Sequence, residues 1–189
     1  MKRLGLLRHA KSEDHQPTGH DFDRGLNAKG RRAAETMGRH LGRKAPKFER
    51  VLASPALRVR ETLDIALDAM GKAAPVDRVD DRRLYLATNE NVAEAVEALG
   101  ESCDNLLVAA HNPGLEDFVL AHVPDDGNNP LRAVIAEKFP TGAFALIEFD
   151  IADWTEIENA QGRLVALVRP RDLDPALGPD MAKQAGTHR

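Results

Sequence analysis

Three short stretches of this chain together supply cationic side chains and imidazoles, a combination suited to phosphoryl chemistry. They read Arg8-His9-Ala10-Lys11-Ser12, Ser54-Pro55-Ala56-Leu57-Arg58 and His111-Asn112-Pro113-Gly114. Arginine guanidinium groups match phosphate oxygens bidentately, and a neutral imidazole can attack phosphorus as a nucleophile. Arg8, His9, Arg58 and His111 together therefore predict a site for a phosphate dianion. Arg8, Arg58 and a protonated His111 would supply the positive charge that Mg²⁺ provides elsewhere.

Each stretch follows a predicted strand, so residues far apart in the chain can meet. Apolar runs at 4–7, 51–53 and 106–110 predict short buried strands, and the polar stretches follow them directly. Helical patterns alternate with these strands, so we expect parallel strands whose carboxyl ends share one edge. The three stretches should therefore face one crevice.

The remaining elements follow from periodicity and from turn residues. We expect helices at 28–44 with Asn27 as N-cap, from Ser54-Pro55 to Gly71, at 90–99 and at 115–123. We expect a weak strand at 75–79, late strands at 143–149 and 164–168, and loops at 11–25 and 124–132. This order predicts a single three-layer α/β domain over 1–173, with a mostly parallel central sheet, helices on both faces and a late antiparallel strand pair. The tail at 174–189 shows little periodicity, and we expect it to be poorly ordered.

The position of Arg58 within its helix bears on its role. Helical side chains tilt toward the N-terminus, so Arg58, in the first turn, leans back toward the crevice. Arg60 lies about 200° further round the helix and is expected in solvent. Lys11 and Ser12 are within reach of the phosphate, and we place Asn112 with them among the phosphate-binding residues.

Composition excludes several classes of protein. The 189 residues carry 26 Lys and Arg against 30 Asp and Glu, a net charge of −4, which argues against a general nucleic-acid binder. No apolar run approaches the roughly 20 residues of a membrane-spanning helix. We therefore expect no membrane partner and a cytoplasmic location. The chain has no P-loop, no HExxH motif and one cysteine, Cys103, expected to be buried, so we expect neither cofactor nor metal.

Taken in order, these motifs resemble the histidine phosphatase (phosphoglycerate-mutase-like) superfamily. The resemblance spans about residues 1–173 and rests on Leu7-Arg8-His9-Ala10, Ser54-Pro55-Ala56-Leu57-Arg58, Glu61-Thr62 and Ala110-His111-Asn112. The chain also resembles the SixA-type phosphohistidine phosphatase branch of this superfamily at Pro140-Thr141-Gly142 and at Arg169-Pro170-Arg171-Asp172-Leu173. The resemblance implies that His9 is the phosphorylated nucleophile, that Arg8 and Arg58 bind phosphate, and that His111 completes the pocket.

The general acid is the main departure from the family pattern. Mutases and many phosphomonoesterases of this family carry a glutamate acid in mid-chain, but no glutamate closely follows Tyr85 here. The spacing does not choose among the possible substitutes Asp21, Asp23, Asp81 and Glu90.

Without a strong acid, an imidazole leaving group is favoured over an alkoxide, because it protonates far more readily near neutral pH. The expected function is thus metal-independent hydrolysis of phosphohistidine on a protein of the histidine-phosphotransfer type. The alternatives are a phosphomonoesterase of a small metabolite and a non-catalytic phosphate-binding module.

Overall fold

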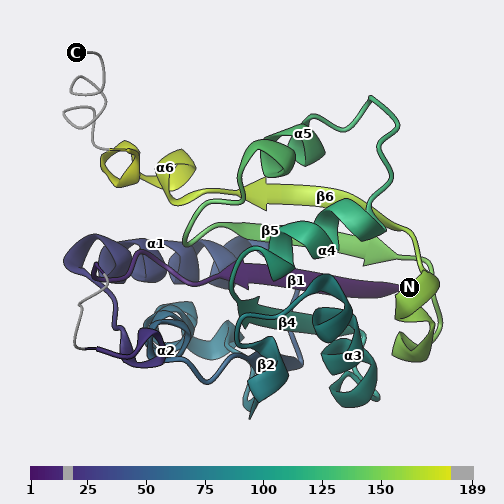
Figure 1. Ribbon diagram of the computed structural model, residues 1–189, viewed down its shortest axis with the longest axis horizontal. Helices are drawn as coiled ribbons and strands as arrows, with labels where there is room; N and C mark the ends of the chain where they lie inside the picture. Colours follow the sequence, from purple (N-terminus) through teal and green to yellow (C-terminus); the bar gives the residue numbers. More distant parts are fainter. Residues whose placement is uncertain (15–18, 180–189) are drawn as a thin grey trace.

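A central sheet organises the molecule (Figure 1). The computed structural model describes residues 1–14 and 19–179, and within these ranges the strands form one six-stranded sheet in the order β3-β2-β4-β1-β5-β6. The strands are β1 (Lys2–Arg8), β2 (Arg50–Ala53), β3 (Asp77–Asp80), β4 (Asn105–Ala110), β5 (Phe144–Phe149) and β6 (Gly162–Val168). Neighbours are parallel from β3 to β1, and β5 is antiparallel to both β1 and β6. The expected mixed sheet with a late antiparallel pair is confirmed.

Helices cover both faces of this sheet, completing the three layers. They are α1 (Ala28–Lys44), α2 (Leu57–Met70), α3 (Asn89–Leu99), α4 (Gly114–His122), α5 (Pro130–Glu137) and the short α6 (Pro170–Leu173). Successive strand residues point to opposite faces. Leu6 of β1 thus joins the core with Val96 of α3 and Phe118 of α4, whereas Leu7 joins the core with Met37 of α1 and Leu63 of α2.

Strand register brings the three polar stretches level with one another. Arg8 at the end of β1 pairs with Ala110 of β4, and Ala53 of β2 pairs with Ala109. The backbone N–H of His9 donates to the Ala110 carbonyl over 3.1 Å, and that of Ser54 donates to Ala109 over 3.0 Å. The chain therefore leaves all three strands at one edge, as expected.

Two helix boundaries differ from the sequence prediction. The second helix begins at Leu57 with Ala56 as N-cap, not at Ser54-Pro55; the Ser54 hydroxyl contacts a histidine side chain and accepts from the Ala56 N–H, ahead of the first helical residue. The predicted loop at 124–132 is wrong at its end, where α5 begins at Pro130. The Asn129 side chain caps this helix by accepting from two backbone N–H groups, a start signal hidden among turn-forming residues.

Other local predictions are confirmed. Asn27 caps α1 by accepting from the Gly30 backbone N–H, and the lone Cys103 is buried. No helix in the described ranges is long and apolar enough to span a membrane.

The segment after α6 continues into a short three-ten turn, η5 (Pro175–Leu177). An ion pair joins Asp174 to Arg32 of α1, with Nη2 and Oδ2 2.5 Å apart. The rest of the predicted tail, 180–189, lies outside the described residues.

Candidate active site

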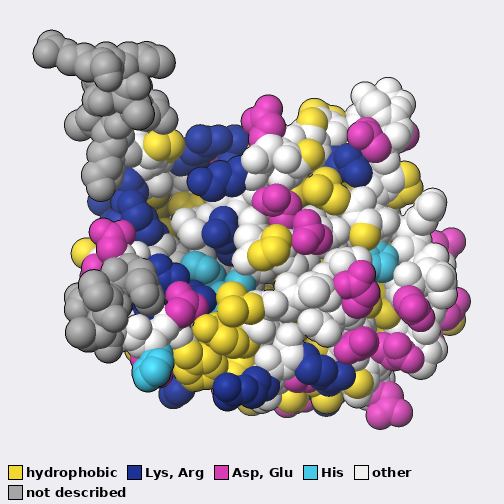
Figure 2. All heavy atoms as spheres, viewed as in Figure 1, with side chains coloured by type: hydrophobic (Ala, Val, Ile, Leu, Met, Phe, Trp, Pro, Cys, Tyr) yellow, Lys and Arg dark blue, Asp and Glu magenta, His cyan; other side chains and the backbone are white. Residues whose placement is uncertain are grey.

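A cavity of about 490 Å³ opens where β1, β2 and β4 end, and we call it the strand-end pocket. It is lined by Arg8, His9, Lys11, Ser12, Asp21, Arg24, Arg58, Tyr85, Leu86, Asn112 and Thr141. The His111 ring adjoins it, with its centroid 5.2 Å from that of His9 and 5.6 Å from that of Tyr85. Figure 2 shows Lys and Arg side chains gathered around the hollow in which histidines are visible, with hydrophobic side chains along its lower rim. Every site residue predicted from the sequence therefore lies in or beside one pocket.

The buried His9 ring is held in a form that leaves one nitrogen free to react. Its Nδ1 lies 2.8 Å from the Ala10 carbonyl oxygen. A carbonyl can only accept, so Nδ1 carries the proton and Nε2 keeps its lone pair. Burial, aided by the nearby Arg58 and Arg8 charges, lowers the pKa of His9 to about 3. His9 is thus a neutral imidazole across the physiological range.

His111 is also buried and neutral. Its Nε2 lies 2.8 Å from the Ser54 hydroxyl, and its buried Nδ1 has no partner among the described residues. Burial, with the neighbouring His9 and Arg58, lowers its pKa to about 3. His111 is therefore neutral in this structure, because burial beside cations disfavours the imidazolium, and its protonation beside a bound phosphate stays a prediction. A bound dianion would favour that charge, so protonation of His111 would accompany anion binding.

Two guanidinium groups approach the imidazoles from different elements. Arg8 ends β1, and its Nη1 donates to the Phe139 carbonyl over 2.6 Å. Arg58 is the second residue of α2 and is almost fully buried, whereas Arg60 is exposed, as expected. The buried Nε atoms of both Arg8 and Arg58 lack a hydrogen-bond partner among the described residues. Buried donors normally find an acceptor, so this pocket is suited to an anion that supplies one.

Asp21 is the one carboxylate among the residues lining the strand-end pocket. Its Oδ2 accepts from Arg58 Nη2 over 2.9 Å and from the Tyr85 hydroxyl over 3.0 Å. Burial raises the pKa of the Asp21 carboxyl, but the Tyr85 hydrogen bond and the Arg58 charge outweigh it and hold the pKa below its usual range. Asp21 is thus ionised and is a weak proton donor in this arrangement.

The other three candidate acids lie outside the pocket lining. Asp23 is exposed, Asp81 pairs with Arg83, and Glu90 is exposed in the first turn of α3. Of the four candidate acids, the structure therefore places Asp21 in the strand-end pocket. The sequence could not make this choice, because it depends on the fold of the loop between β1 and α1.

Hydrogen bonds hold the loop after β1 in place and account for two of the sequence motifs. Thr62 accepts from the Ala10 backbone N–H over 3.0 Å and donates to the Arg58 carbonyl over 2.6 Å. Glu61 Oε2 accepts from the Leu26 backbone N–H over 2.6 Å. The Gly142 N–H donates to the His9 carbonyl over 2.9 Å, from a backbone φ of 73° that favours glycine. The Glu61-Thr62 and Pro140-Thr141-Gly142 motifs therefore position His9.

Sequence reasoning did not assign to the site four residues that line the pocket, Arg24, Tyr85, Leu86 and Thr141, nor the hydroxyl of Ser54. Tyr85 had a signal, since it is the only tyrosine in the sequence and stands between predicted elements, shortly after a run of charged residues. Ser54 was assigned to helix capping, and only the level ends of β2 and β4 reveal its place beside His111.

The secondary phosphate-binding candidates differ in how they are held. Lys11 is exposed, Ser12 is half-buried, and the Asn112 amide donates to Glu116 over 2.8 Å while its buried Oδ1 has no partner in the described chain. Across the described ranges, no three His, Cys, Asp or Glu side chains gather where they could hold a metal ion.

A neutral imidazole beside a second imidazole and two guanidinium groups, at the carboxyl edge of an α/β sheet, is an arrangement suited to phosphoryl transfer. Comparison with known proteins agrees. The family model of the histidine phosphatase superfamily, branch 1, matches residues 4–115. The chain belongs to this superfamily, and it is a phosphatase.

Individual relatives indicate the branch of the superfamily to which the chain belongs. An uncharacterised protein of Mycobacterium leprae is 34% identical over 170 residues, covering 87% of this chain and all of the relative. A solved structure assigned as the phosphohistidine phosphatase SixA of Agrobacterium tumefaciens is 27% identical, with a TM-score of 0.72 over 89% of this chain and 98% of its own. The chain therefore falls in the SixA-type branch. A mycobacterial glucosyl-3-phosphoglycerate phosphatase, 18% identical, shares the fold with a TM-score of 0.60 over 88% of this chain and 98% of its own.

Arg58→Lys should lower kcat/KM at least tenfold, since lysine keeps the charge but loses the planar fork that binds two oxygens. Arg60→Lys, at an exposed position of the same helix, should change it less than twofold. Steady-state kinetics on phenyl phosphate, with circular dichroism to check folding, measures both. Equal losses at the two positions would contradict the assignment of Arg58 to the pocket.

The two buried histidines should make folding stability depend on pH. Their folded-state pKa of about 3 lies below the roughly 6.5 of an unfolded histidine, so below that value the unfolded chain binds more protons. Stability should fall as pH drops from about 6.5 toward 3, by up to about 1.4 kcal/mol per pH unit for each histidine. The free energy of unfolding, measured in urea, should depend less steeply on pH between 6.5 and 4 for His111→Asn than for the wild type. An identical pH dependence would refute the buried neutral state.

Proposed function

We propose that this phosphatase removes phosphate from phosphohistidine on a signalling protein, through a phosphohistidine intermediate on His9 and without a metal. The observation that carries the proposal is the His9 ring, neutral and with Nε2 unprotonated because Nδ1 donates to the Ala10 carbonyl. A cytoplasmic location is part of the proposal.

In the first step, His9 Nε2 forms a bond to phosphorus as the phosphorus–nitrogen bond of the substrate breaks. The substrate imidazole, already protonated from solvent on its unphosphorylated nitrogen, keeps the electron pair of the broken bond and so leaves neutral. Arg8 and Arg58 bind the nonbridging oxygens through their guanidinium groups, and His111 contributes an N–H. In the second step, water attacks the phosphorus on His9, releasing phosphate and restoring the imidazole.

The state of Asp21 supports an imidazole leaving group. This carboxyl is ionised and committed to Arg58 and Tyr85, so it is poorly placed to donate a proton to an alkoxide. An imidazole leaving group needs no strong acid from the enzyme, because it is itself basic near neutral pH.

The ion pair between Asp21 and Arg58 favours a second candidate, hydrolysis of a small phosphorylated metabolite. A dianion that took over the Arg58 fork would remove one partner of Asp21 and place negative charge beside it, which raises the pKa of a carboxyl. Substrate binding would then turn Asp21 into an acid within the strand-end pocket.

The test of the proposed function is turnover of a phosphorylated histidine-phosphotransfer domain beside a panel of alkyl phosphates. We expect kcat/KM to favour the phosphodomain by at least a hundredfold. A preference for any alkyl phosphate would instead favour the metabolite phosphatase.

Metal independence has its own test. Activity toward the phosphodomain should stay within about twofold after dialysis against a chelator, because arginines neutralise the charge on phosphate in this mechanism. Loss of activity that added Mg²⁺ or Zn²⁺ restores would contradict the mechanism.

A further inference from the structure

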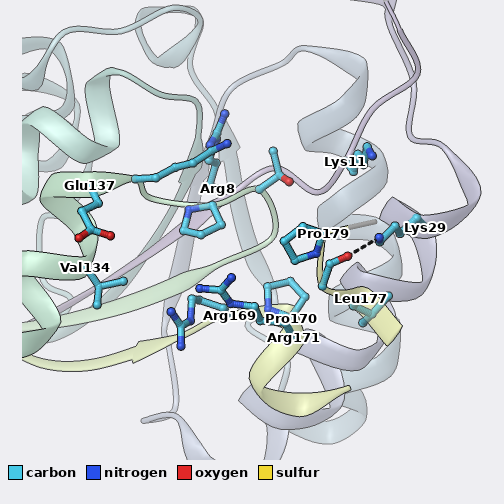
Figure 3. Close-up of a pocket in the computed structure, with 14 residues that line it drawn as sticks. Arg8, Lys11, Lys29, Val134, Glu137, Arg169, Pro170, Arg171, Leu177 and Pro179 are labelled. Carbon is cyan, nitrogen blue, oxygen red and sulfur yellow. Dashed lines mark hydrogen bonds between the residues drawn. The ribbon is translucent and has the colours of Figure 1, made fainter. Parts of the chain in front are cut away.

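A second cavity, of about 470 Å³, opens beside the strand-end pocket and shares Arg8, Lys11 and Thr141 with it. We call it the basic groove. Among the described residues, six cationic side chains and one acid, Glu137, line it; the cations are Arg8, Lys11, Lys29, Lys138, Arg169 and Arg171. Figure 3 shows the labelled side chains entering the groove from β1, α1, α5 and the segment after β6. The groove thus gathers cations in a chain whose net charge is −4.

Local pairing accounts for only part of this charge. Arg169 pairs with Asp172 at 2.8 Å, and the Lys29 ammonium donates to the Gly178 carbonyl. The side chains of Lys11, Lys138 and Arg171 form no hydrogen bond or ion pair with the described residues. Three cations around one cavity therefore remain available to an outside anion.

The groove also gives a further role to two of the sequence motifs, one of which already positions His9. Pro140 and Thr141 form one wall, and Arg169, Pro170 and Arg171 form another. Pro170 packs close to Gly142, the residue whose N–H binds the His9 carbonyl. The groove is therefore built on the same turn that positions the reactive histidine.

We propose that the basic groove docks acidic side chains that flank the phosphohistidine on the surface of the partner protein. This inference rests on the proposed function. Arg8 lines both cavities, so a phosphoryl group in one places neighbouring residues of the same partner beside the other. Opposite charges so placed raise the association rate and favour the correct partner.

The part of the strand-end pocket that the groove does not share supports a protein surface as the occupant. Leu86 is 59% exposed there, at an unusual backbone φ of 52°, next to Tyr85. The strand-end pocket thus adjoins both the basic groove and an exposed apolar side chain. A protein surface can contact both while its phosphohistidine enters the pocket.

The test uses two synthetic phosphohistidine peptides of one sequence, with either Asp or Asn flanking the phosphohistidine. The groove variant is Lys138→Gln with Arg171→Gln, and the control, Lys47→Gln with Lys72→Gln, removes two exposed lysines outside the groove. We expect wild type and control to favour the acidic peptide by about tenfold in kcat/KM at low salt. The groove variant should lose at least fivefold on the acidic peptide and little on the neutral one.

Three results would overturn the proposal, and they are distinguishable. Equal wild-type turnover of both peptides would show that the groove does not select for acid. Failure to hydrolyse either peptide, with phenyl phosphate still hydrolysed, would remove the proposed function and this inference with it. If the groove variant lost turnover only on a small aryl phosphate that bears a carboxylate, the groove would instead bind the second anionic group of a metabolite.

Discussion

Replacing His9 with alanine should lower kcat/KM by at least about 10⁴-fold, a loss typical of removing a covalent nucleophile. The neutral ring with its free Nε2 is the group in the strand-end pocket best suited to attack phosphorus. The two arginines and His111 would remain in the variant, so it should still bind inorganic phosphate. Stopped-flow or discontinuous phosphate release measures the rate, and phosphate binding by calorimetry checks that the pocket is folded.

His40→Ala is the matched control, because His40 lies on α1 and does not line the strand-end pocket. It should retain activity within about twofold. A His9→Ala enzyme with wild-type turnover would remove the nucleophile assignment, and equal losses in both variants would mean that the assay reports folding.

The rates on three leaving groups should follow their ability to leave, with phosphohistidine fastest, an aryl phosphate intermediate and an alkyl phosphate slowest. We expect at least a hundredfold between the first and last, about the contribution of a missing general acid. Single-turnover measurement isolates the chemical step, so that product release does not mask it.

Asp21→Asn decides whether an acid has been overlooked. If Asp21 only positions Arg58, the ratio of alkyl to phosphohistidine rates should stay within about threefold of the wild-type ratio. Asp23→Asn, at an exposed position two residues away, is the control. A further hundredfold loss confined to the alkyl and aryl phosphates would identify Asp21 as the general acid and would favour the metabolite phosphatase.

The gathering of Arg8, Arg58 and His111 could be predicted from sequence because it follows from one rule, that parallel strands end at the same edge. Apolar runs locate the strands, and the residues after them must then meet. The pocket-facing side of α2 was predictable for a similar reason, since helical geometry separates Arg58 from Arg60.

Features that depend on loops and burial could not be predicted in the same way. Asp21 reaches Arg58 only through the fold of the loop after β1, and Ser54 meets His111 because β2 and β4 end level. The neutral state of His111 depends on burial beside His9 and Arg58, which no local pattern records. The start of α5 was missed because Asn129 and Pro130 are signals shared by loops and helix N-termini.

The most direct test of the account is to trap the phosphoenzyme during turnover of a radiolabelled phosphohistidine peptide. Rapid quenching in alkaline denaturant should yield label on His9 that is stable to alkali and lost in acid, formed and consumed at rates compatible with turnover. The His9→Ala variant should carry none. Label on another residue, or full turnover with no labelled enzyme at any time, would contradict the proposed mechanism.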